Sequence, residues 1–179
     1  LEAYLERVNS DVLGSVEVDA AVALDDVAEG SEVGLVMRDG VLHANPAGGT
    51  ATAVSVTSAA AGEAVGVADF EGVVDYETGS VSVLPVPTVT DDDRLSPDVV
   101  STHVPDEGLV AVAGTEAYAL VSRSDTSPDI RFGTAEGVAE AGMLGLDVLL
   151  VAVTDEIPRH TSKLRDRNVP HRVLDSDAF

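Results

Sequence analysis

The sequence predicts two kinds of structure in one chain: a duplicated small β-barrel or sandwich, followed by an α/β unit on a parallel sheet. An internal repeat before residue 90 predicts the β unit. Alternating apolar and amphipathic segments later in the chain predict a three-layer β-α-β-α-β unit. We therefore expect a β domain over 1–90, a linker over 91–106 and an α/β domain over 107–179.

Residues 128–154 carry the clearest α/β pattern. Asp129–Phe132 predicts a short strand after Pro128, whose missing N–H suits the first position of a strand. Thr134 is a suitable helix N-cap, and Gly145 stands where a helix ends in the left-handed conformation. We expect a strand, a helix over 134–144 and a second strand.

Leu146–Val153 is almost entirely apolar, as is typical of a strand buried on both faces of a parallel sheet. A helix over 156–167, with Pro158 in its first turn, and a strand over 170–174 are expected next. This order predicts right-handed crossovers. Residues 106–122 allow either a strand and a helix or one helix.

The β unit is predicted from a repeat of 20–44 in 52–76, with a shift of 32 residues. Asp39-Gly40 and Glu71-Gly72 stand at the same place in the two copies and predict hairpin turns. Two copies are too few for a solenoid, so we expect a closed unit that hides its strand edges. Ser80–Val86 alternates and is expected as its last strand. The matched positions include Ala21 with Ala53, Val22 with Val54, Ala28 with Ala60, Gly30 with Gly62, Val33 with Val65, Gly34 with Gly66, and Gly40 with Gly72.

The net charge is −22, from 32 acidic and 10 basic residues, while hydrophobic residues make up 45% of the chain. The apolar content argues against disorder. An acidic surface adapted to high salt fits better, because molar salt shortens the Debye length to about 3 Å. The acidity also argues against direct binding of nucleic acid phosphates.

Several functional classes have no support in the sequence. There is no cysteine, and hence no disulfide or thiolate chemistry. No apolar run has the length of a membrane span, and no signal peptide is visible, so we expect a cytoplasmic protein that does not contact the membrane. Leu1, Leu5 and Val8 have helical spacing and predict the end of a helix that begins upstream.

The candidate ligand site lies where the predicted parallel strands end. Gly133 and Thr134 follow one strand, Asp155 follows the next, and Arg131 stands close to the first turn. Backbone N–H groups after Thr134 suit an anionic group. No glycine-rich nucleotide motif is present. We expect Arg131, Gly133, Thr134, Glu136 and Asp155 to bind a small anionic metabolite.

Two acidic groups have competing interpretations. Glu136 and Glu140 are one helical turn apart and suit either acid–base chemistry or the positive end of the helix dipole, which we favour. Asp91-Asp92-Asp93 suits either a divalent cation or a solvated loop, and we favour the loop. The four histidines show no metal-ligand spacing. We predict no catalytic residue, no metal site and no cofactor.

Two stretches resemble a family of archaeal, including haloarchaeal, transcriptional regulators. They are Pro128–Gly133 with Glu136, Glu140-Ala141 and Gly145-Leu146, and Gly30–Leu35 with Met37–Ala44. The resemblance covers nearly the whole chain and implies an upstream winged helix-turn-helix. The family has a glycine-rich turn before an arginine, of which Asp91-Asp92-Asp93-Arg94 keeps only the arginine.

We therefore expect the ligand-sensing or oligomerisation part of a regulator, which forms a homodimer and reaches DNA only through an upstream domain. The alternative is an enzyme that acts on a small anionic metabolite at the strand ends, with Glu136, Glu140 or Asp155 in acid–base roles. A third interpretation is a dimerisation scaffold that pairs through the β unit.

Overall fold

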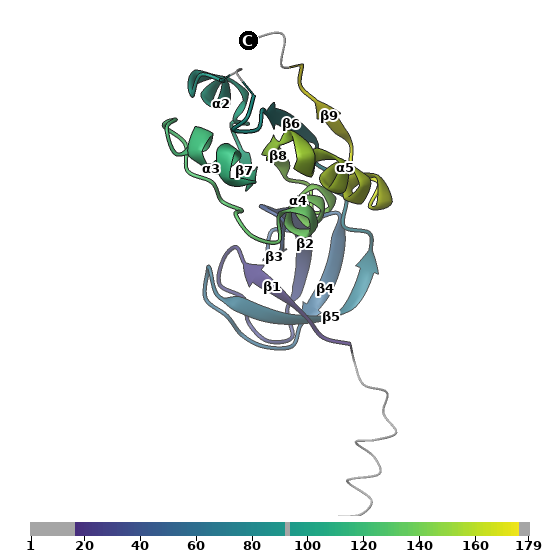
Figure 1. The fold of residues 1–179 in the computed structure, drawn as a ribbon. Helices are drawn as coiled ribbons and strands as arrows, with labels where there is room; N and C mark the ends of the chain where they lie inside the picture. Colours follow the sequence, from purple (N-terminus) through teal and green to yellow (C-terminus); the bar gives the residue numbers. More distant parts are fainter. Residues whose placement is uncertain (1–16, 92–93, 176–179) are drawn as a thin grey trace, which may run out of the picture. The chain divides into compact units, whose positions relative to one another are not determined.

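The structure is a computed structural model that describes residues 17–91 and 94–175. The chain divides into two compact units, Leu1–Tyr76 and Glu77–Phe179 (Figure 1). The boundary differs from the expected linker at 91–106, because the strand at 81–86 pairs within the second unit. The fold class is mixed, with a barrel and a parallel α/β sheet.

The first unit contains a closed five-stranded barrel. The strands follow the order β1-β3-β2-β4-β5, and β5 closes against β1. β1 runs parallel to β3, and all other neighbours are antiparallel. The strands are β1 (Asp19–Ala23), β2 (Glu32–Arg38), β3 (Val41–Asn45), β4 (Ala51–Ser55) and β5 (Ala64–Gly72).

The two predicted hairpin turns have different outcomes. Asp39 and Gly40 connect β2 to β3 with φ values of 50° and 71°. Two consecutive positive φ angles are what a two-residue hairpin loop requires, so this turn is confirmed. The prediction at Glu71-Gly72 is wrong, because β5 continues through both residues and pairs there with β4.

Small side chains fill the barrel. Leu35 is fully buried, and the other buried members of this core are alanine and valine. Neighbouring backbone segments also approach closely. A Cβ atom at Gly34 would lie 2.0 Å from backbone atoms of both Gly48 and Gly49, so only glycine fits there. The buried residues are Ala21, Ala23, Val27, Val33, Leu35, Ala44, Ala51, Ala53, Ala59, Val65 and Val67.

Hydrogen bonds in the barrel recur with the 32-residue shift of the sequence repeat. Val27 and Ala59 exchange two backbone hydrogen bonds with each other, at 2.8 and 2.9 Å. The β1–β5 and β2–β4 ladders correspond in the same way, since Ala21 pairs with Val65 and Ala53 with Val33. The two connections also match: Gly30 N–H donates to Ser55 O, and Gly62 N–H donates to Ala23 O.

The second unit is built on a parallel sheet of order β7-β8-β6-β9. Its strands are β6 (Val81–Val86), β7 (Gly108–Ala113), β8 (Asp147–Val153) and β9 (His171–Val173). Its helices are α2 (Asp98–His103), α3 (Thr115–Val121), α4 (Thr134–Met143), the 3-10 turn η1 (Thr154–Glu156) and α5 (Ile157–Asp166).

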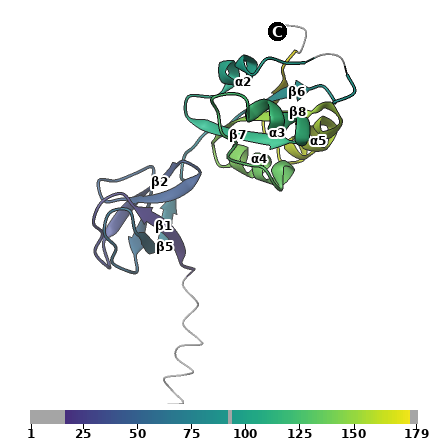
Figure 2. The ribbon, with the colours of Figure 1, turned by 60° about the vertical axis from the view of Figure 1, so that its left-hand side comes forward.

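The sheet lies between two helical layers (Figure 2). Leu149 and Val151 of β8 pack in one core with α2 and α3. Val148 and Leu150, which point to the opposite face, pack in a second core with α4 and α5. β8 is thus buried on both faces, and its bounds agree with the apolar run predicted for it.

Three segments differ from the sequence interpretation or resolve it. β6 lies between β8 and β9, although it was expected to end the β domain. Ser80 and Ser82 alternate with Val81 and Val83, which is the pattern of a half-buried antiparallel strand. The expected linker contains α2, which buries Val99 and Val100. Residues 106–122 form β7 and α3, separated by Gly114 at a φ of 99°.

The strand expected at Asp129–Phe132 is reduced to a single bridge between Ile130 and Ala111. Asp129 accounts for this, because its carboxylate accepts a hydrogen bond from Val110 N–H at 2.8 Å and replaces a ladder bond.

The predicted helix end at Leu1–Val8 lies outside the described residues. Within 17–91 and 94–175, no helix combines the length and apolar character needed to cross a membrane.

Candidate functional site

Gly133 and Thr134 begin α4, and both have a structural role there. Gly133 is the N-cap residue and adopts the left-handed conformation at a φ of 60°. Thr134 is buried, and its hydroxyl donates to the backbone carbonyl of Val112 at 3.3 Å. Thr134 therefore fixes α4 to β7 and provides no side-chain cap.

Arg131 contacts Tyr118, whereas Asp155 lies in η1 after β8. The Arg131 guanidinium lies 5.9 Å from the ring centre of Tyr118, over the ring face. Both residues line a polar cleft of about 480 Å³ with the loop 122–128. Asp155 is exposed in η1, where the neighbouring Thr154 hydroxyl donates to Val86 O at 3.1 Å.

Glu136 forms an ion pair with Lys163 between α4 and α5, with 2.9 Å between Oε1 and Nζ. This hydrogen bond and the Lys163 charge lower the pKa of the Glu136 carboxyl below its ordinary value. Glu136, Glu140 and Asp155 are all exposed. A general acid or base with a raised pKa needs desolvation, so their exposure gives the acid–base interpretation no support.

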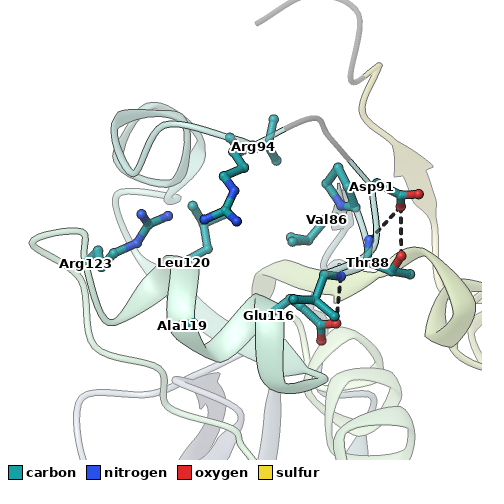
Figure 3. A pocket seen from close by; sticks show the side chains of 11 residues that line it. Val86, Thr88, Asp91, Arg94, Glu116, Ala119, Leu120 and Arg123 are labelled. Carbon is teal, nitrogen blue, oxygen red and sulfur yellow. Dashed lines mark hydrogen bonds between the residues drawn. The ribbon is translucent and has the colours of Figure 1, made fainter.

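A different cleft lies at the carboxyl end of β6 (Figure 3). Its volume is about 340 Å³. Ligands bind at this edge of parallel sheets because the loops there are free to carry polar groups. The cleft is lined by Val86, Pro87, Thr88, Val89, Asp91, Arg94, Leu95, Glu116, Ala119, Leu120 and Arg123.

The turn after β6 holds two carboxylates in place. Asp91 Oδ2 accepts hydrogen bonds from Thr88 N–H at 2.8 Å and from the Thr88 hydroxyl at 2.9 Å. Glu116 Oε1, from the first turn of α3, accepts one from Val89 N–H at 3.1 Å. Each carboxylate keeps its second oxygen without a hydrogen bond to the described part of the chain.

Two arginines line the same cleft. Arg94 precedes α2 and Arg123 follows α3, and in Figure 3 both guanidinium groups extend over the cleft beside Leu120. Neither forms an ion pair within 17–91 and 94–175. The cleft thus brings together two of the ten basic residues of a chain that has 32 acidic ones.

The sequence contains only part of the signal for this cleft. Arg94 is the residue that the family resemblance preserves, and Asp91 belongs to the acidic run. Asp92 and Asp93 lie outside the described residues. Nothing in the sequence indicates Arg123, because the fold brings it to Arg94 from the far end of α3.

The histidines show no metal arrangement. Among the described residues, no group of three His, Asp or Glu side chains is placed to hold an ion. His160 is buried in α5, and its Nδ1 contacts the backbone carbonyl of Glu156 at 2.7 Å. This contact with the backbone one turn earlier gives His160 a structural role.

Comparison with known proteins finds a relative and a family, neither of which is described with an activity. It is 26% identical over 178 residues to the uncharacterized protein MJ0558 of Methanocaldococcus jannaschii, covering 97% of this chain and 68% of the relative. No solved structure is significantly similar to the chain. Residues 75–173, which include the sheet of the second unit, match the family described as a domain of unknown function, DUF7839, and the chain therefore belongs to that family.

Proposed function

We propose that the chain is the ligand-sensing and oligomerising part of an archaeal transcriptional regulator and does not itself bind DNA. The resemblance of 30–44 and 128–146 to such regulators supports this, as does the relative from an archaeon. The net charge of −22 disfavours contact with DNA phosphates. A winged helix-turn-helix encoded upstream would supply that contact.

The cleft at the end of β6 is the sensing site in this proposal. The observation that carries it is the pair Arg94 and Arg123, which face an apolar cleft without an ion-pair partner in the described residues. Guanidinium groups bind carboxylates and phosphates through paired, charge-assisted hydrogen bonds. The ligand is therefore a small molecule that carries an anionic group.

Thermal unfolding of the full chain tests the site with a panel of organic acids, phosphate, nucleotides and amino acids. A ligand raises the Tm saturably because it binds only the folded state. We expect at least one compound to do so, and the rise to disappear in Arg94→Gln/Arg123→Gln but persist in Arg165→Gln on α5. A panel without any saturable rise contradicts the sensing site.

The regulatory context has two further tests. An upstream reading frame without a winged-helix pattern would contradict the regulator proposal. Light scattering at high salt is expected to give the mass of a homodimer, since most regulators bind DNA as symmetric pairs. A monomeric mass would exclude the oligomerisation role, including a scaffold that pairs through the barrel.

We also infer that the barrel derives from an internal duplication of the segments 20–44 and 52–76. The support is the agreement between the shift of matching residues and the shift of the backbone hydrogen bonds. A chain in which 20–51 is repeated in tandem is expected to fold as a barrel. A disordered product, judged by NMR dispersion, would contradict this inference.

A further inference from the structure

The lining of the cleft at the end of β6 is electrically balanced. It contains Arg94 and Arg123 on one side and Asp91 and Glu116 on the other, as Figure 3 shows. The chain as a whole has more than three acidic residues for each basic one. A ligand with negative charge alone would gain from the arginines and be repelled by the two carboxylates.

Both carboxylates are held by hydrogen bonds to the turn after β6. Backbone N–H groups of Thr88 and Val89 hold one oxygen of each, so little side-chain entropy is lost when a ligand binds. The remaining oxygens of Asp91 and Glu116 are acceptors for a cationic donor such as an ammonium group.

The surface between the two charged sides is apolar. Leu120 and Val86 belong to the core beneath the cleft, and Leu95 packs against that core. The volume of about 340 Å³ lies near the lower end of the roughly 300–1,000 Å³ of small-molecule sites. A compact ligand with an aliphatic part fits such a space better than a nucleotide.

From these three features we infer that the cleft binds a free α-amino acid with an aliphatic side chain. Arg94 and Arg123 bind its carboxylate, Asp91 and Glu116 bind its ammonium group, and the side chain covers Leu95 and Leu120. This inference rests on the proposed sensing site and specifies the class of ligand.

Calorimetric titration of the full chain tests the inference with leucine, isoleucine, valine and methionine. Three comparison compounds each lack one part of leucine. Isocaproate lacks the ammonium group, isoamylamine lacks the carboxylate, and glycine lacks the side chain. We expect at least one aliphatic amino acid to bind about tenfold or more tightly than each of these three compounds, because each loses charged or apolar contacts.

Two variants separate the charged contacts. Arg123→Gln should weaken binding of both the amino acid and isocaproate. Glu116→Gln keeps an oxygen that can accept the hydrogen bond from Val89 N–H. This variant should weaken binding of the amino acid about tenfold and leave binding of isocaproate unchanged or tighter. Arg165→Gln and Glu107→Gln, both exposed outside the cleft, are matched controls that should change neither affinity.

The outcomes distinguish the amino-acid inference from the proposed sensing site. Binding of succinate or phosphate at Arg94 and Arg123, without binding of any aliphatic amino acid, overturns this inference and leaves the sensing site in place. Equal binding of leucine and isocaproate also overturns it. If none of the compounds binds to the wild-type chain, both this inference and the sensing site fail.

Discussion

The barrel and the α/β unit bury their β-strands in different ways. The barrel closes its ladder from β1 round to β5 and fills the interior with alanine and valine. The α/β unit leaves its sheet open and covers the two faces with separate helical layers. A closed ladder satisfies its backbone groups internally, whereas an open parallel sheet needs long connections.

This difference explains where the candidate site is found. The long connections after β6 and around α3 bring Arg94, Arg123, Asp91 and Glu116 together, although they come from separate segments. Two of the barrel connections instead bond to each other through Val27 and Ala59. We infer that the barrel supplies a rigid element and the α/β unit supplies recognition.

The largest expected effect is Gly34→Ala in the barrel. The new methyl group would overlap the backbone of Gly48 and Gly49, so the expected loss of stability exceeds about 3 kcal/mol. Gly137→Ala in α4 is the control, because a Cβ there meets Ile130 no closer than 3.4 Å, and it should stabilise the helix by about 0.5–1 kcal/mol. Chemical denaturation measures both, and a neutral Gly34→Ala would contradict the close approach.

Leu150→Ala and Leu35→Ala compare the two units directly. Both side chains are fully buried, and each truncation should cost about 2–5 kcal/mol. Hydrogen exchange should show loss of protection mainly in the unit that carries the change, because the units have separate cores. Equal loss of protection in both units after either change would show that they unfold together.

Salt should stabilise the barrel more than the α/β unit, in keeping with the halophilic surface that we propose. Residues 17–76 contain eleven acidic residues and one basic residue, Arg38, so their repulsion has little internal compensation. Molar KCl screens this repulsion. Hydrogen exchange at low and molar KCl measures the effect in each unit, and greater salt protection of the α/β unit would contradict the prediction.

The smallest effect concerns Glu136. Lys163 lowers the pKa of this carboxyl below its ordinary value of 4.5. The ion pair therefore contributes its full stabilisation at pH values above 4.5, and this contribution is lost as the pH falls through the lowered pKa. Lys163→Met should raise the pKa toward 4.5, with little change in stability because Glu136 is exposed. An NMR titration of the Glu136 carboxyl carbon that gives the same midpoint in both proteins would show that the pair is absent in solution.

Local patterns predicted the parts of the fold that depend on neighbouring residues. The apolar run gave the bounds of β8, and Asp39-Gly40 gave its hairpin turn. Partners that are distant in sequence were not predictable in this way. The alternation of Ser80 and Ser82 with valine suggested a strand of the β domain, although β8 and β9, the partners of β6, come much later in the chain.

The candidate site shows the same limit. Thr134 stands at the start of a helix, and its sequence context predicts an N-cap. In the fold, its buried hydroxyl donates instead to the backbone carbonyl of Val112. The strand-end rule led to Gly133, Thr134 and Asp155, whereas the cleft that we propose lies at the end of β6. The order β7-β8-β6-β9 cannot be obtained from local periodicity. Arg123 becomes a candidate binding residue only in the folded chain, where it lines the same cleft as Arg94.

The central claim is that Arg94 and Arg123 bind the anionic group of a small ligand. The chain has nine arginines, so the side-chain Nε–Hε signals of the arginine-labelled protein can be assigned by single substitutions. During titration with leucine, or with whichever compound raises the Tm, the signals of Arg94 and Arg123 should shift saturably while those of Arg159 and Arg165 stay in place. Unchanged signals of Arg94 and Arg123, or a uniform shift of all arginines, would contradict the account.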